Sequence, residues 1–140
     1  MDYSFSAPTA MEFKALYDET GWADWPLDHF ERALLGSWVV CTVRDDAGRL
    51  IGMGRFISNG ALHAFVTEMI VTEQTRGAAI GAEVLARLVA QARHRGVEDV
   101  QLFAARGRAE FYERHGFERR PESGPGMDVE GVRDCYRGQS

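Results

Sequence analysis

The spacing of apolar residues changes abruptly between residues 71 and 80. Residues 61–71 carry apolar side chains at odd and even positions alike, which is typical of a central strand covered on both faces. From Ile80 onward the apolar residues recur at the spacing of one helix face. They are Ile80, Val84, Leu85, Leu88, Val89 and Ala92. The sequence therefore predicts a buried strand that leads into a long amphipathic helix, closed by Gly96.

Strand and helix patterns alternate along the rest of the chain. Further strands are expected at residues 3–6, 37–44, 49–58 and 97–104, and further helices at residues 9–20, 26–35 and 108–115. Turn residues 45–48 separate two of these strands, so they form a hairpin. This order predicts a mixed sheet flanked by helices.

Capping signals mark the ends of the first two helices. Thr9 and Glu12 have the spacing of a capping box, and Gly21 stands where a C-cap glycine is expected. Pro26 suits the first turn of the second helix. That helix is expected to bury Leu27, Phe30 and Leu34 and to end at Gly36.

Size and charge exclude several classes of protein. At 140 residues the chain is expected to form a single domain over residues 1–140. A net charge of −5 argues against a nucleic-acid partner. No apolar run approaches the roughly 18 residues of a membrane span, and the N-terminus lacks a signal-peptide pattern, so we expect a cytoplasmic protein.

The residues that commonly bind metals are not grouped. Cys41 and Cys135 lack the C-x-x-C spacing of a metal or redox site, and free cysteine in an apolar strand behaves as a small hydrophobe. The four histidines also show no metal spacing. We therefore expect no metal.

Residues 75–81, TRGAAIG, lie between the buried strand and the long helix and carry small side chains. Such a segment lets backbone N–H groups face an anion, with the helix dipole and Arg76 adding positive charge. The alternative is that Gly81 serves only close packing of the helix on the strand. A P-loop is excluded because Ala82 and Glu83 follow Gly81, and a G-x-G-x-x-G pattern is absent.

Two motifs in this region resemble those of the GCN5-related N-acetyltransferase (GNAT) family. Residues 69–82 resemble its acetyl-CoA motif, Q/R-x-x-G-x-G/A, and residues 111–117, FYERHGF, resemble its F-Y-x-x-x-G-F signature. YDETGW at 17–22, RFISNG at 55–60 and PGM at 125–127 are similar to a bacterial and plastid-like branch that includes plant serotonin N-acetyltransferases. The resemblance covers residues 12 to 128. It implies an α+β fold with three α/β/α layers and a mostly antiparallel central sheet.

The resemblance also implies where acetyl-CoA binds. The backbone of Met69, Ile70 and Val71 would pair with the pantetheine arm, and a bulge in that strand would aim an N–H at the thioester oxygen. Phe111 belongs to the second signature. The pyrophosphate would be held by the backbone of Arg76, Gly77, Ala78, Ala79, Ile80, Gly81 and Ala82. Ala79 departs from the family, which usually has glycine there, and residues 104–106 lack the asparagine that often contacts pantetheine.

The family's catalytic roles fall on two residues. Tyr112 corresponds to the general acid that protonates the departing thiolate, unless it only packs against the sheet. Glu68 interrupts an apolar strand and is the candidate general base. The alternative is that Glu68 is a structural partner of Arg55. Glu110 is a second, less favoured carboxylate.

The acceptor is expected to be a small-molecule primary amine that attacks the thioester directly in a ternary complex. Trp22, Trp25 and Arg55 are candidates for contacting it, because the family commonly binds the acceptor between its first two helices. An enzyme that acetylates protein or peptide amines and a non-catalytic module that binds coenzyme A are the alternatives. A homodimer is common in the family.

Overall fold

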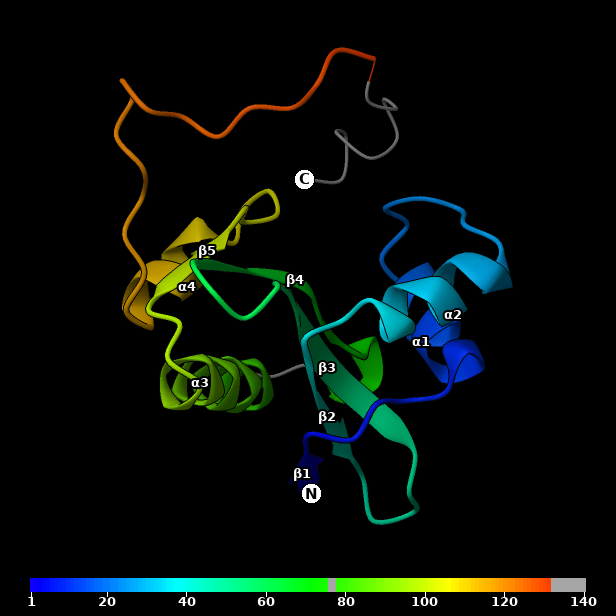
Figure 1. Ribbon diagram of the computed structural model, residues 1–140. Helices are drawn as coiled ribbons and strands as arrows, with labels where there is room; N and C mark the ends of the chain where they lie inside the picture. Colours follow the sequence, from blue (N-terminus) through cyan, green and yellow to red (C-terminus); the bar gives the residue numbers. More distant parts are fainter. Residues whose placement is uncertain (76–77, 132–140) are drawn as a thin grey trace.

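A five-stranded sheet forms the middle layer of the computed structural model, which describes residues 1–75 and 78–131 (Figure 1). The strands, in sheet order, are β1 (Asp2–Ser4), β2 (Val39–Arg44), β3 (Leu50–Ile57), β4 (His63–Val71) and β5 (Asp99–Leu102). Neighbours from β1 to β4 pair antiparallel, whereas β5 pairs parallel to β4. The mixed, mostly antiparallel sheet predicted from the sequence is therefore confirmed.

Helices cover both faces of this sheet, as Figure 1 shows. On one side lie α1 (Ala10–Asp18) and α2 (Leu27–Leu35). On the other lie α3 (Ala78–His94) and the short α4 (Ala109–Arg114), and the 3-10 turn η1 (Glu73–Thr75) follows β4. The three-layer α/β/α arrangement is confirmed. None of the helices in the described part of the chain is long and apolar enough to cross a membrane.

The two faces of the sheet are packed with different side chains. Toward α3 the core is mainly aliphatic, and its fully buried members are Cys41, Val43, Ile51, Phe56, Val84, Leu88, Ala92 and Val97. Toward α1 and α2 the core is rich in aromatic rings, and its members include Phe13, Tyr17, Phe30, Met53 and Ile70. The predicted helical face of α3 is the one that is buried.

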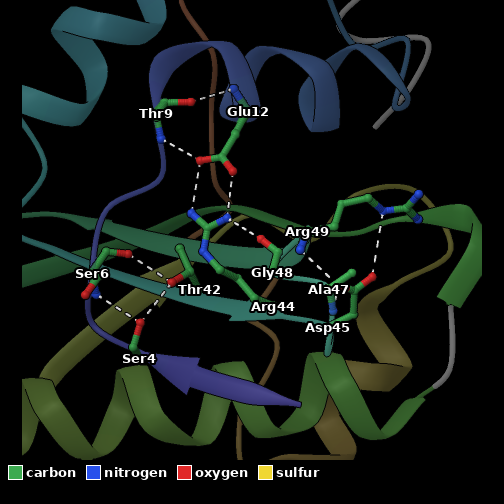
Figure 2. A network of polar contacts seen from close by, with 10 residues as sticks. All are labelled: Ser4, Ser6, Thr9, Glu12, Thr42, Arg44, Asp45, Ala47, Gly48 and Arg49. Atoms are coloured by element: carbon green, nitrogen blue, oxygen red, sulfur yellow. Dashed lines mark hydrogen bonds and ion pairs between the residues drawn. The ribbon is translucent and has the colours of Figure 1, made fainter.

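The predicted capping box is present and is tied to the sheet (Figure 2). The Thr9 N–H donates to the Glu12 carboxylate at 2.9 Å, and the Glu12 N–H donates to Thr9 Oγ1 at 3.1 Å. Arg44 Nη1 and Nη2 donate to the same carboxylate at 2.6 and 3.0 Å. Chiefly because of Arg44, the pKa of Glu12 falls to about 2. The first turn of α1 is therefore fastened to the end of β2.

Some expected details differ from the structure. Helix α1 ends at Asp18 with Glu19 as its C-cap, and Gly21 takes its positive φ of 69° in the following turn. Leu27 is 38% exposed rather than buried. In α2 it is Phe30 that is buried, because its ring packs edge-on against Phe13 of α1 at 4.9 Å.

Candidate active site

Strand β4 contains a β-bulge at the residue predicted to be the general base. Arg55 pairs with Thr67 and Met53 with Ile70, so Gly54 alone lies opposite both Glu68 and Met69. Glu68 has a φ of 48° and is the only non-glycine residue with a positive φ in the described ranges. Left-handed backbone at a residue other than glycine stores strain, which is commonly found at functional sites. The bulge implied by the resemblance is therefore present.

The bulge reverses which side chains of β4 face α3. Before it, the even-numbered Ala64 and Val66 pack against the α3 side, and after it the odd-numbered Met69 and Val71 do. A one-residue shift in a strand moves side chains to the opposite face. Gly54 makes room for this arrangement, since a Cβ there would collide with Met69 Sδ and lie 2.8 Å from Leu88 Cδ1.

Glu68 is held by a nearly buried ion pair. Its Oε1 lies 2.6 Å from Arg55 Nε, and the two side chains are 14% and 10% exposed. Thr67 Oγ1 donates to Oε2 at 2.7 Å. Arg55 also donates to Ser37 Oγ, at 3.1 Å, just beyond the end of α2. The partnership with Arg55, left open by the sequence, is thus a fact of the structure, and Arg55 connects Glu68 to α2.

Glu68 also lines a cavity of about 270 Å³ between the sheet and the first two helices. The other lining residues are Phe13, Tyr17, Trp25, His29, Phe30 and Ala33. Trp25 stacks on His29 with ring centroids 5.4 Å apart, and Trp25 Nε1 donates to the Tyr17 hydroxyl at 3.1 Å. The cavity therefore has aromatic walls and a carboxylate on the sheet side.

The three residues predicted to contact the acceptor occupy different positions. Trp25 lines the cavity directly. Trp22 does not line the cavity, but its ring packs edge-on against Tyr17, with ring centroids 5.7 Å apart. Arg55 is not among the lining residues, but it donates to two of them, to Glu68 Oε1 at 2.6 Å and to the Ala33 carbonyl at 3.4 Å. The remaining lining residues were not predicted as part of the site: Phe13, Tyr17, His29, Phe30 and Ala33. The i, i+4 spacing of Phe13 and Tyr17, which marks one helix face, is the signal that could have found two of them.

Only the first part of β4 pairs with β5. The parallel pairing begins at His63 opposite Asp99 and ends at Val66 opposite Leu102. Residues 67–71 continue β4, with no β5 partner in the described part of the chain. The backbone on this edge is available to an extended ligand, which can add to a sheet as another strand does. This edge fits the pantetheine arm predicted at Met69, Ile70 and Val71.

The first turn of α3 fits an anion. Helix geometry leaves the first N–H groups of α3 without intrahelical acceptors. Ala79 is exposed, Ile80 is buried and Ala82 is half-buried. A Cβ on Gly81 would lie 3.4 Å from Phe111 Cζ, an ordinary contact, so packing alone does not demand glycine there. Arg76, Gly77 and the Ala78 side chain lie outside the described residues, so the predictions for them stand untested.

Helix α4 brings the second signature against α3. Phe111 is buried and contacts the Gly81 position, while Tyr112 is half-buried between Phe111 and Phe117, with ring centroids at 5.1 and 5.9 Å. The Phe117 N–H donates to the Tyr112 carbonyl at 3.0 Å, which closes the turn through Gly116. Burial raises the pKa of Tyr112, and Arg108 opposes this effect. Tyr112 therefore keeps its proton at neutral pH and can donate it. Glu110, the less favoured carboxylate, is exposed.

Among the described residues, no group of three or more His, Cys, Asp or Glu side chains is arranged to hold a metal ion. Cys41 is buried as a free thiol, and burial raises its pKa to about 11. Cys135 lies outside the part of the chain that the structure describes.

Comparisons with known proteins point in one direction. The model of the acetyltransferase (GNAT) family matches residues 3–117. A histone acetyltransferase of soybean (Glycine max) is 30% identical over 126 residues, which cover 83% of this chain and 54% of that protein. A chloroplastic serotonin N-acetyltransferase of rice (Oryza sativa subsp. japonica) is 31% identical over 90 residues, covering 64% and 45%. The chain thus spans about half the length of these two relatives.

A solved structure shares the fold. A Staphylococcus aureus protein has a TM-score of 0.82 at 23% identity, and the match covers 92% of this chain and 98% of the other. At this identity the similarity concerns the fold, not the substrate.

Proposed function

This chain belongs to the GNAT family of acetyltransferases, and we propose that it transfers the acetyl group of acetyl-CoA to the primary amine of a small molecule. The observation that carries this proposal is the bulge at Glu68. It places Glu68 on the lining of the aromatic cavity, two residues beyond the last pair of β4 with β5, Val66 and Leu102. An acceptor on one side of the strand and a thioester on its open edge would meet at this residue.

The lining of the cavity favours an acceptor with a flat, apolar body. A cavity of about 270 Å³ walled by aromatic rings suits a ring or short hydrocarbon, and its carboxylate suits an ammonium group. The rice relative is named for serotonin, an aromatic amine. We therefore rank aromatic amines first among acceptors.

Glu68 would bind the ammonium of the acceptor and remove its proton. A carboxylate has about four acceptor positions, and the contacts with Arg55 and Thr67 use only part of them. The remaining positions can accept from an amine or from a water that relays the proton. Arg55 would keep the carboxylate fixed while this happens.

Tyr112 would supply the proton that leaves with the thiolate of coenzyme A. Its raised pKa means that the hydroxyl remains protonated at neutral pH. General acid catalysis of this kind typically contributes about 10²- to 10⁴-fold to the rate. The attack is direct, so the rest of the acceleration comes from alignment of amine and thioester and from backbone N–H groups near the bulge.

A peptide amine is the second candidate acceptor, because the soybean relative is named as a histone acetyltransferase. A peptide would present a lysine side chain to Glu68 across the rim of the cavity. The two candidates differ in one observable: small amines would suffice for turnover in the first and would fail in the second.

A thiol-release assay with acetyl-CoA tests the proposal. The acceptor panel contains aromatic amines, polyamines, amino sugars, amino acids and lysine peptides. Steady turnover with an aromatic amine is the expected result, and turnover with lysine peptides alone would favour the second candidate. Absence of turnover with every acceptor, together with binding of coenzyme A, would favour a non-catalytic module.

Two substitutions test the roles of the residues. Tyr112→Phe and Glu68→Gln are each expected to lower kcat by about 10²-fold or more, while Tyr112→Phe keeps affinity for coenzyme A. Glu110→Gln is the matched control, because it removes an exposed carboxylate from the same helix as Tyr112. Equal losses in Glu110→Gln and Glu68→Gln would contradict the role of Glu68.

A further inference from the structure

The end of α1 is bonded to the end of β4 through one carboxylate. Glu19, the C-cap of α1, accepts hydrogen bonds from Thr72 Oγ1 at 3.0 and 3.1 Å on its two oxygens. The Glu73 N–H donates to Glu19 Oε1 at 3.1 Å. Thr72 is only 4% exposed, although Glu19 itself is exposed. We name these three residues the Glu19 latch.

The latch lies between the two proposed binding regions. On one side, α1 carries Phe13 and Tyr17, which line the aromatic cavity. On the other side, Thr72 follows the strand proposed for pantetheine, and Glu73 begins η1, which leads toward α3. Glu19 and Thr72 are 53 residues apart in the sequence, so this contact joins two distant parts of the chain.

The contacts of Thr72 fix the start of the turn. Its N–H donates to the Ile51 carbonyl of β3 at 2.8 Å, and its carbonyl accepts from the Thr75 N–H at 3.2 Å. The Glu73 N–H, at the start of η1, has its acceptor in Glu19. A carboxylate that accepts from the first N–H groups of a helical turn stabilises that turn.

We propose that Glu19 is a positioning residue that holds η1 and the end of β4 in the conformation that binds coenzyme A. This inference rests on the proposed function for the location of the coenzyme. When only a fraction of molecules has the binding conformation, the apparent Kd rises by the inverse of that fraction. Loss of the latch would lower this fraction and weaken binding without touching the coenzyme.

The charge of Glu19 alone predicts the opposite change in the Kd for coenzyme A. Coenzyme A is an anion, so removal of a negative charge from Glu19 would by itself tighten binding. Glu73→Gln is a matched control for this effect. It removes an exposed carboxylate one residue from Thr72 and leaves the backbone N–H of the latch in place.

The test is calorimetric titration of coenzyme A into the full chain. Glu19→Ala is expected to raise the Kd about tenfold, the effect of losing the two charge-assisted contacts, and Glu73→Gln to leave it unchanged or lower it. Glu19→Gln keeps an acceptor for the Glu73 N–H and is expected to restore most of the affinity. Thr72→Val is expected to weaken binding by less than Glu19→Ala, because it leaves the Glu73 N–H contact in place. Adding Thr72→Val to Glu19→Ala should cost little more, because the Thr72 hydroxyl has already lost its acceptor.

Kinetics separates positioning from general weakening of the fold. Glu19→Ala is expected to raise the KM for acetyl-CoA by a similar factor and to leave kcat at saturation near the wild-type value. Wild-type affinity in Glu19→Ala, or a lower kcat with an unchanged KM, would overturn the inference. If the wild-type protein itself fails to bind coenzyme A, the proposed function fails instead.

Discussion

The two faces of the sheet are packed with different kinds of side chain. The face toward α3 is a mainly aliphatic layer in which Val84 and Leu88 are fully buried. The face toward α1 and α2 contains aromatic rings, a cavity and the ion pair of Arg55 with Glu68. Both faces belong to the same strands, so the side chains and not the backbone topology create the difference.

Because of this difference in packing, we expect stability and catalysis to depend on different faces of the sheet. Aliphatic side chains pack to high density and leave no space for a ligand. On the other face aromatic residues line a cavity, and a buried ion pair contributes little net stability compared with apolar side chains of the same volume. We therefore expect the α3 face to determine how stable the protein is, and the α1 and α2 face to determine what it does.

The largest effect is expected when the ion pair is broken. Arg55→Met would leave the Glu68 carboxylate in a nearly buried position without its cation, and breaking such a pair typically costs about 3–5 kcal/mol. Urea unfolding measures this change. Turnover should fall as well, because Glu68 loses the contact that orients it.

The double variant Arg55→Met with Glu68→Met sharpens the result. Replacement of both partners by apolar side chains is often neutral, so stability should return to near the wild-type value while activity stays lost. If the double variant remained as unstable as Arg55→Met alone, the pair would be part of the structural core, and the contrast between the faces would fail.

The opposite pattern is expected on the other face. Leu88→Ala removes a fully buried side chain from the α3 core and should lower the free energy of unfolding by about 3 kcal/mol. The kcat/KM of the folded fraction should fall far less than in Glu68→Gln, since Leu88 does not line the cavity and meets the bulge only from behind Gly54. A large change in kcat/KM at low temperature would contradict the division.

Sequence patterns predicted these two faces unequally. The helical spacing from Ile80 to Ala92 was enough to predict the α3 core, because one period specifies one buried face. The pairing of Arg55 with Glu68 could only be posed as an alternative, since it depends on the register of β3 against β4. The bulge at Glu68 arises from that register and from Gly54. The family resemblance implied a bulge in this strand but did not give its position.

Residues of the acceptor cavity were also only partly predictable. Trp22 and Trp25 were predicted to contact the acceptor because they lie between the first two helices, but only Trp25 lines the cavity. His29 was missed, because its contact with Trp25 is a stacking of rings that the sequence does not signal. Short-range patterns locate elements well, whereas a cavity depends on how two helices meet a sheet.

A smaller effect is expected from the hydroxyl of Tyr17. Tyr17→Phe removes the acceptor of the Trp25 Nε1 donor, and the loss of one buried hydrogen bond costs about 1 kcal/mol. Because Trp25 lines the cavity, the KM for an aromatic amine should rise while the Kd for coenzyme A stays unchanged. A higher Kd for coenzyme A with an unchanged KM for the amine would show that this face binds coenzyme A and not the acceptor.

The smallest effect is expected at the second arginine–carboxylate pair, which isolates burial as the deciding variable. Arg44 and Glu12 approach as closely as Arg55 and Glu68, at 2.6 Å, but their side chains are 29% and 32% exposed. Solvent screens such a half-buried pair, which contributes about 1 kcal/mol, so Glu12→Gln, which can still complete the capping box with Thr9, should change unfolding at pH 7 far less than Arg55→Met.

Acid should remove even this contribution. The folded-state pKa of Glu12, about 2, lies below its ordinary value of 4.5, so the stabilisation is present above pH 4.5 and is lost as the pH falls toward 2. The difference in unfolding free energy between the wild type and Glu12→Gln should therefore shrink between pH 6 and pH 2.5. If Glu12→Gln instead cost as much as Arg55→Met at neutral pH, distance and not burial would govern the two pairs. Burial of the Arg55–Glu68 pair would then not distinguish the face toward α1 and α2 from the rest of the protein.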